Sequence, residues 1–212
     1  MGDFMYKSVI LPYNYGDLEP VLNSETINVH YNKHYLGYLE KLNKILNDIN
    51  YDYRYTKEEL VSHIEEIPID VRDDVLYNLG GVLNHELYFY SMSNNKVNVP
   101  IGALRKKIID EYGTIENFKD EFIKTANKLV GSGYAFLVLN NNLKLEIINT
   151  PNQETPYLYG LIPIMALDLW EHAYYLVYRN RRSEYIEKFF EIVDYNNINK
   201  NYEKAVKEIS KK

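Results

Sequence analysis

Five histidines are the side chains of this 212-residue sequence best suited to bind a transition metal, because cysteine is absent. His30 and His34 are four residues apart, so they share one face of a helix. His85 lies within an apolar helical pattern, and His172 follows Asp168 by four residues in the segment DLWEHAYY. One imidazole from each of two packed helices, together with this Asp and His, would form a three-histidine, one-aspartate ligand set. Such a set suits manganese, iron or zinc and leaves a position open for water or substrate.

Each pattern also has a simpler interpretation. A single histidine on an apolar helix face is usually a buried structural residue, and an Asp-x-x-x-His pair alone is weak support for a metal. His63 lies in the charged segment VSHIEE and is expected at the surface. A di-iron helical bundle is excluded, because its sites need Glu-x-x-His pairs. The residues three positions before His30, His34, His85 and His172 are Ile27, Tyr31, Val82 and Leu169.

Helical periodicity dominates the N-terminal half of the chain. Apolar residues recur every three or four positions over residues 27–49 and 71–92, which predicts two long helices. Between them, Thr56 and Glu59 form a capping-box pattern that predicts a short helix through residue 64. The polar, asparagine-rich stretch 91–100 then predicts a boundary between two domains.

The period changes in the C-terminal half. Short runs rich in β-branched and aromatic residues at 133–139 and 143–149 are split by three asparagines, which predicts a hairpin, and residues 161–167 predict a third, buried strand. The expected helices span residues 101–111, 115–129, 184–193 and 202–209. The expected fold class is α+β: a long α-hairpin domain over 1–93, then an α/β domain over 101–212 with a three-stranded antiparallel sheet.

Composition and charge exclude several function classes. The net charge of −6 provides no basic surface for nucleic acid. Apolar runs at 135–139 and 161–167 are far shorter than the roughly 20 residues of a membrane helix. The N-terminus lacks a signal pattern, so we expect the cytoplasm, or an exported or surface-layer form if an N-terminal segment was removed. The 22 tyrosines fit A/T-rich codon usage; the alternative is a tyrosine-rich surface that cross-links into an assembly.

Six short motifs in one order resemble the iron/manganese superoxide dismutases. They are LPYNY at 11–15, HYNKH at 30–34, NH at 84–85, GSG at 131–133, NQ at 152–153 and DLWEHAYY at 168–175. The resemblance spans residues 8 to 205 and implies a helical hairpin followed by an α/β half. It implies conversion of superoxide to dioxygen and hydrogen peroxide by one mononuclear manganese or iron per subunit, cycling between trivalent and divalent states. The alternative, a non-catalytic metal-binding or structural homologue in an assembled layer, would be favoured by loss of a ligand or of Tyr38, and neither is lost.

The resemblance also implies individual roles at the metal. The implied metal ligands are His30, His85, Asp168 and His172, with a water or hydroxide completing a five-coordinate site. Tyr38 matches the family's gateway tyrosine, and His34 matches the histidine beside it in the access funnel. Gln153 matches the glutamine that hydrogen-bonds the bound solvent and tunes its proton affinity.

Other matches concern the subunit interface and the approach of the substrate. Glu171 and Tyr175 match residues that reach the partner's metal-ligand and funnel histidines, so the resemblance implies a homodimer, possibly a tetramer. Lys33 and Arg181 match basic residues near the funnel mouth. Their positive charge would focus the superoxide anion despite the net negative charge of the chain.

The choice of metal depends on position 81. In the family, Gly at this position paired with a glutamine from the C-terminal half marks the manganese type, and this sequence has Gly81 and Gln153. Iron remains the alternative, because both types share the same four ligands. The chain departs from the family at Phe89, Tyr134 and Phe136, where tryptophan is common, and only Trp170 is retained.

Overall fold

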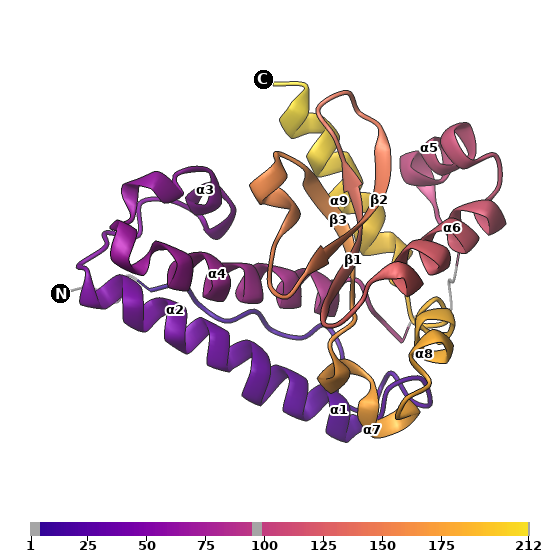
Figure 1. The fold of residues 1–212 in the computed structure, drawn as a ribbon. Coiled ribbons are helices and arrows are strands. Elements are labelled where there is room, and N and C mark those ends of the chain that lie inside the picture. Colours follow the sequence, from indigo (N-terminus) through magenta and orange to yellow (C-terminus); the bar gives the residue numbers. More distant parts are fainter. Residues whose placement is uncertain (1–4, 95–98, 212) are drawn as a thin grey trace.

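The computed structural model describes residues 5–94 and 99–211 and begins with a helical half (Figure 1). Helices α2 and α4 lie side by side, and the short helix α3 packs near one end of α4. The segment expected as one helix over 27–49 is continuous but contains a π-helical stretch, η1. The elements of this half are α1 (Ser24–Val29), η1 (His30–Tyr35), α2 (Leu36–Asp48), α3 (Lys57–Ser62), η2 (Ile64–Glu66) and α4 (Ile69–Tyr90).

The C-terminal half contains a three-stranded antiparallel sheet with strand order β2-β1-β3. The expected class, α+β with a helical hairpin and this sheet, is confirmed. The strands are β1 (Gly133–Leu139), β2 (Leu145–Pro151) and β3 (Ile162–Asp168). The helices are α5 (Gly102–Tyr112), α6 (Ile115–Lys128), η3 (Pro156–Tyr159), η4 (Glu171–Ala173), α7 (Tyr175–Tyr178), α8 (Arg182–Phe189) and α9 (Tyr195–Ile209).

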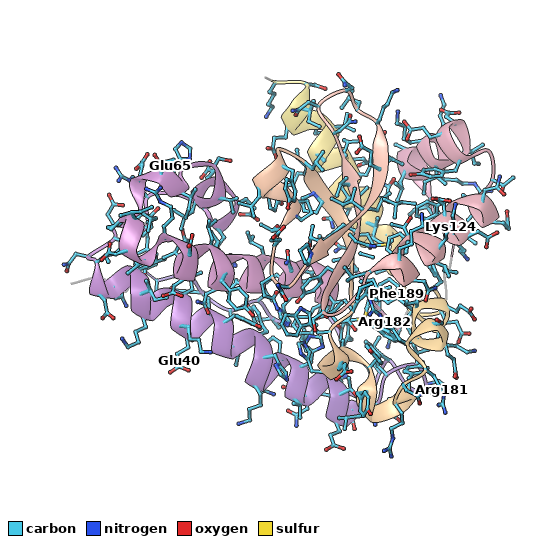
Figure 2. The ribbon with its side chains drawn as sticks, viewed as in Figure 1. Glu40, Glu65, Lys124, Arg181, Arg182 and Phe189 are labelled. Atoms are coloured by element: carbon cyan, nitrogen blue, oxygen red, sulfur yellow. The ribbon has the colours of Figure 1, made fainter. Side chains whose placement is uncertain are left out.

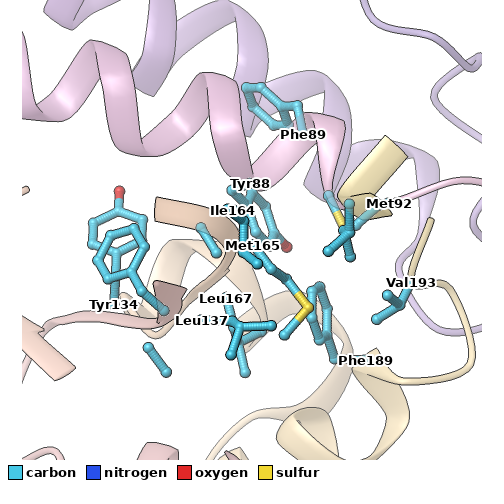
Figure 3. Packing of buried hydrophobic residues seen from close by; sticks show 14 of the residues in the cluster. Tyr88, Phe89, Met92, Tyr134, Leu137, Ile164, Met165, Leu167, Phe189 and Val193 are labelled. Atoms are coloured by element: carbon cyan, nitrogen blue, oxygen red, sulfur yellow. The ribbon is translucent and has the colours of Figure 1, made fainter. Parts of the chain in front are cut away.

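Strand β1 is the centre of the hydrophobic core. All seven of its residues are buried, as expected for a strand paired on both sides and covered on both faces. Helices α4 and α9 both pack against β3, and α6 packs against β1 and β2. Figure 3 shows Tyr88 of α4 and Phe189 of α8 among Leu137, Met165 and neighbouring apolar side chains. The C-terminal turns of α4, which carry His85, lie beside the end of β3.

Three expected boundaries were wrong, for local reasons. Strand β2 begins at Leu145 instead of residue 143, because Asn140 Oδ1 accepts hydrogen bonds from the backbone N–H groups of Asn142 and Lys144 and forms a turn. The helix expected over 184–193 ends at Phe189, because the following residues pair with the end of α4 through a bridge between Met92 and Val193 (Figure 3). The helix expected over 202–209 begins seven residues earlier, at Tyr195. The expected boundary over 91–100 includes residues 95–98, which lie outside the described residues.

Most tyrosine side chains are buried or half-buried. Only four of the 22 side chains are exposed, namely Tyr15, Tyr77, Tyr159 and Tyr175. This distribution removes the tyrosine-rich surface on which cross-linking would depend. Within the described residues, no helix combines the length and the apolar character needed to cross a bilayer.

Candidate metal centre

Four side chains from four separate elements converge on one point. His30 begins η1, His85 lies on α4, Asp168 ends β3, and His172 belongs to η4. Their ligand atoms all lie within 4.8 Å of one another. Asp168 Oδ2 is 3.0 Å from Nε2 of His30, 3.5 Å from Nε2 of His172 and 3.8 Å from Nε2 of His85. Ligands held at about 2.1 Å from one ion lie about 3.0 Å apart at right angles and about 3.6 Å apart at 120°, so this spacing fits a single ion.

The hydrogen bonds of this cluster leave a metal-binding atom free. His85 Nδ1 lies 2.6 Å from the carbonyl oxygen of Gly81, and because a carbonyl only accepts, Nδ1 carries the proton. The lone pair is therefore on Nε2, which faces Asp168. The Nε2 atoms of His85 and His172 are buried and have no hydrogen-bond partner among the described residues. Buried, unpartnered acceptors are costly, and a cation at this point would satisfy both.

Burial and mutual contact also set the protonation states. Burial lowers the pKa of His30 and, more strongly, that of His85, which favours neutral imidazoles. Burial alone would raise the pKa of Asp168, but the neighbouring imidazoles of His172 and His30 outweigh it and hold this pKa well below its usual range. Neutral histidines and an ionised aspartate are the states that bind a divalent or trivalent metal. The residues present therefore fit a manganese, iron or zinc ion.

The carboxylate of Asp168 is held from several sides. Its Oδ1 accepts a hydrogen bond from the backbone N–H of Trp170 at 2.8 Å, which directs Oδ2 toward the histidines. The hydroxyl of Tyr185 donates to the backbone oxygen of Asp168 at 3.0 Å. The hydroxyls of Tyr185 and Tyr88 are hydrogen-bonded at 3.0 Å, so α8 and α4 are both tied to the end of β3.

Gln153 and Tyr38 form a second polar pair beside the cluster. Gln153 is 1% exposed, and its Nε2 donates to the hydroxyl oxygen of Tyr38 at 3.1 Å. Asn84 fixes the backbone at this position, because its Nδ2 donates to the carbonyl oxygens of Gln153 and Glu154 at 3.2 and 3.1 Å. The Tyr38 ring is 5.3 Å from that of His85, between ring centroids.

Two consecutive glycines on α4 make room for this pair. A Cβ atom on Gly80 would lie 2.0 Å from the carbonyl oxygen of Gln153. A Cβ atom on Gly81 would lie 2.6 Å from the ring of Tyr38. Any side chain at either position would therefore displace the glutamine or the tyrosine.

His34 lies against the cluster without joining it. Its ring stacks on that of His172 with centroids 3.9 Å apart. Burial lowers the pKa of His34 to about 4, and the charges of His172 and His30 act in the same direction. His34 is therefore neutral at pH 7, half-buried at the side of the site that Tyr38 also borders.

Comparisons with known proteins cover nearly the whole chain. Residues 5–93 match the alpha-hairpin domain of iron/manganese superoxide dismutases, and residues 100–201 match their C-terminal domain. The chain belongs to the iron/manganese superoxide dismutase family. Curated relatives include "Superoxide dismutase [Mn]" of Listeria innocua, 41% identical over 94% of this chain and 98% of the relative, and that of Listeria monocytogenes, 40% identical with the same coverage.

Aromatic rings surround the site of this superoxide dismutase chain even where tryptophan is replaced. Trp170 stacks on His172 with centroids 5.7 Å apart, and Phe89 lies 5.2 Å from His30. Tyr134 pairs with Asp168 across β1 and β3, and its buried hydroxyl lies 3.3 Å from His85 Nδ1. Tyr134 stands where the family commonly has tryptophan, and its hydroxyl has a polar neighbour in His85.

The four residues matched to the interface and the funnel mouth are all on the surface. Glu171 and Tyr175 are exposed, as are Lys33 and Arg181. Arg181 forms an ion pair with Glu184, with Nε 2.7 Å from Oε2, and in Figure 2 it lies farther out than Arg182.

The sequence patterns did not identify several residues that position the site. Asn84 lies in the NH motif, but the motif predicts no function for it. The family resemblance assigns a role to Gly81 and none to the adjacent Gly80. Two adjacent glycines inside an apolar helical pattern are themselves a signal, because glycine weakens a helix unless close contact requires it. Nothing in the sequence distinguishes Tyr88 and Tyr185 from ordinary core residues.

Proposed function

We propose that this chain is a manganese superoxide dismutase in which His30, His85, Asp168 and His172 hold one ion per subunit. The observation that carries the proposal is the convergence of three Nε2 atoms and one carboxylate oxygen within 4.8 Å, with two of those nitrogens otherwise unpartnered. A bound manganese ion supplies one-electron redox chemistry. Two superoxide anions and two protons then give one dioxygen and one hydrogen peroxide.

The protons are the part of the reaction that this chain's own residues govern. Burial raises the pKa of Tyr38, so its hydroxyl keeps its proton at neutral pH. That oxygen accepts from Gln153 Nε2, so the two side chains form one hydrogen-bonded pair beside the metal-ligand residues. We assign Tyr38 and Gln153 to proton delivery and His34 to the access side of Tyr38.

Local charge has to overcome the overall repulsion between the substrate and the chain. The net charge of −6 repels an anion, and Lys33 is exposed one residue before His34. We assign Lys33 to attraction of superoxide. Arg181 contributes less, because Glu184 offsets its charge. A rate that falls with added salt would support this assignment.

Manganese is favoured over iron by the space around Gly81. A glutamine side chain at position 81, the iron-type arrangement, would collide with the Tyr38 ring. The glutamine beside the site must then come from Gln153, as in the manganese type. The named manganese enzymes among the relatives support the same choice.

The test is to strip the metal, reload separate samples with manganese and with iron, and measure superoxide turnover per bound ion. Activity with manganese alone would support the proposal in full. Equal activity with iron would remove the metal assignment, and no activity with either would favour the non-catalytic alternative.

We also propose that the chain forms two domains, 1–93 and 101–212, and acts as a homodimer, possibly a tetramer. The two family models meet at residues 93 and 100, which supports the domain division. Glu171, Tyr175 and Leu176 are exposed beside the metal-ligand segment, which supports an interface at this face. The cytoplasm remains a prediction, to be tested by cell fractionation.

A further inference from the structure

A buried ionic cluster lies next to the metal-ligand residues but belongs to none of the roles described above. Glu86 directly follows His85 on α4, and its side chain is 12% exposed. Its carboxylate accepts hydrogen bonds from both Lys57 of α3 and the hydroxyl of Tyr35, the latter at 2.9 Å. Tyr35 is fully buried and is the last residue of η1.

This cluster connects the two helices that carry histidine ligands. His30 begins η1 and Tyr35 ends it, while His85 and Glu86 are adjacent on α4. The Tyr35 hydroxyl also accepts from the backbone N–H of Val9, so the same atom ties the N-terminal segment to both helices. The Tyr35 ring itself is 6.4 Å from the ring of His85.

Hydrogen bonds, more than packing, determine where the Glu86 carboxylate lies. Glu86 lines a cleft of about 940 Å³ formed by α3, α4, β3 and α9, so one of its sides faces this open space. At this point the Tyr35 bond joins η1 to α4, and the Lys57 bond from α3 holds the same carboxylate in place. Groups that hydrogen-bond a metal ligand directly commonly change metal affinity by roughly 10- to 100-fold, and Glu86 acts one step further out, through the helices that carry His30 and His85.

We propose that Glu86, held by Lys57 and Tyr35, is a positioning residue that sets the separation of His30 and His85 at the metal centre. This inference rests on the proposed function, because it needs an ion at the four ligands. It goes beyond that function by assigning a role to three residues that touch neither the substrate nor the ion. A carboxylate is suited to this role because it accepts from two donors on two different elements at once.

The experiment compares Glu86→Leu and Glu86→Gln in the manganese-loaded protein. We measure the rate of manganese release to excess chelator and the visible absorption of the trivalent form, with the unfolding temperature recorded alongside. Glu86→Leu should release the ion roughly tenfold faster or more and change the absorption band, whereas Glu86→Gln, which still accepts from Tyr35, should restore most of both. Equal release rates and spectra for Glu86→Leu and the wild type would overturn the proposal.

Glu111→Leu is the matched control. Glu111 also pairs with a lysine, Lys107, and also bonds a second element through the backbone N–H of Leu145, but it lies in the C-terminal half. It should lower the unfolding temperature without changing release or spectrum. A similar change in this control would overturn the proposal, because the loss of any lysine–glutamate pair that also bonds a second element would then have the same effect.

If Glu86→Leu does not fold, a smaller change at Tyr35 tests the same proposal. Tyr35→Phe retains the ring and removes the hydroxyl bonds to Glu86 and to the backbone N–H of Val9, and Tyr112→Phe, which loses a hydroxyl bond to Leu145, is its control. Faster release for Tyr35→Phe alone supports the inference, and unchanged release overturns it. A wild-type protein that retains no manganese would instead contradict the proposed function itself.

Discussion

The backbone of α4 prepares His85 to bind a metal. The carbonyl oxygen of Gly81, one turn earlier, accepts a hydrogen bond from Nδ1–H at 2.6 Å, so Nε2 keeps its lone pair toward Asp168. A helix supplies such a carbonyl at i−4 to every interior residue, but only a buried histidine has no competing water. The same imidazole in a solvent-exposed position would lack this preference.

Removal of this imidazole should abolish tight metal binding. We expect His85→Ala to retain less than about 0.1 equivalents of manganese, because the remaining ligands cannot close the site. Metal content by atomic emission after dialysis measures this. His63→Ala is the control, since His63 is exposed and far from the cluster in the sequence. Stoichiometric metal in the His85 variant would contradict the ligand assignment.

The adjacent glycines Gly80 and Gly81 differ in whether the sequence alone predicts their roles. Position 81 could be interpreted from the sequence because the family resemblance gave it meaning. The role of Gly80 could not, because it depends on a contact with Gln153, which lies 73 residues away in the chain and meets α4 only after the sheet has formed. Tyr185 was missed for the same reason, since its bond to Asp168 joins two elements that no local pattern connects.

A methyl group at Gly80 should therefore damage the site and the fold together. We expect Gly80→Ala to lower the free energy of unfolding by about 2 kcal/mol, because the new Cβ meets the Gln153 carbonyl at 2.0 Å. Gly37→Ala on α2 is the control: no atom lies within 4 Å of its added Cβ, so it should gain about 0.5–1 kcal/mol from helix propensity. Urea denaturation of both variants tests this. An unaffected Gly80 variant would show that the loop carrying Gln153 shifts freely.

At the scale of the element, the π-helical stretch η1 affects which residues share a face. Eight residues of regular α-helix overshoot two turns by about 80°, so His30, His34 and Tyr38 would drift around the helix. The wider turns of η1 reduce this drift and keep the three side chains toward one site. Sequence periodicity predicted the helix but not this stretch, because a π-helical stretch of six residues changes the three- and four-residue apolar spacing too little to be recognised.

The start of α9 was missed because its first turn is polar. Its asparagines predict a loop by composition, yet Asp194 Oδ1 accepts hydrogen bonds from the backbone N–H groups of Asn196 and Asn197 and begins the helix. Tyr195 and Ile198, both buried, then supply the apolar face. Tertiary contact with α5 and β3 overrides the weak helix propensity of asparagine.

Loss of this cap should be measurable on its own. We expect Asp194→Ala to cost about 1 kcal/mol of stability, because two N–H groups at the helix start lose their acceptor. Lys200→Ala, an exposed change on the same helix, should have almost no effect. Thermal unfolding distinguishes them, and equal unfolding temperatures would mean that water replaces the cap without cost.

For the whole molecule, the metal centre is a product of both halves of the chain. Two ligands come from the helical half and two from the end of β3 and the segment after it. The order of motifs identified all four residues, whereas spacing alone left open which of His30 and His34 faces inward. The structure decides that choice, because His30 Nε2 lies 3.0 Å from Asp168 Oδ2 and His34 stays outside the ligand cluster.

Glu171 and Tyr175 lie on either side of the metal-ligand residue His172 in the sequence. Both are exposed, and so is Leu176, which follows Tyr175 on α7 and is 48% exposed. An exposed carboxylate and exposed apolar side chains in the same short segment as a metal ligand are what a two-fold interface would cover. Each subunit would then contribute a charge to the other's site.

We expect Glu171→Ala to weaken the dimer roughly tenfold or more, because the partner's imidazole loses its acceptor in a dry interface. Glu40→Ala, exposed on α2 (Figure 2), is the control and should not change association. Sedimentation over a dilution series measures both, and equal dissociation constants would place the interface on another face.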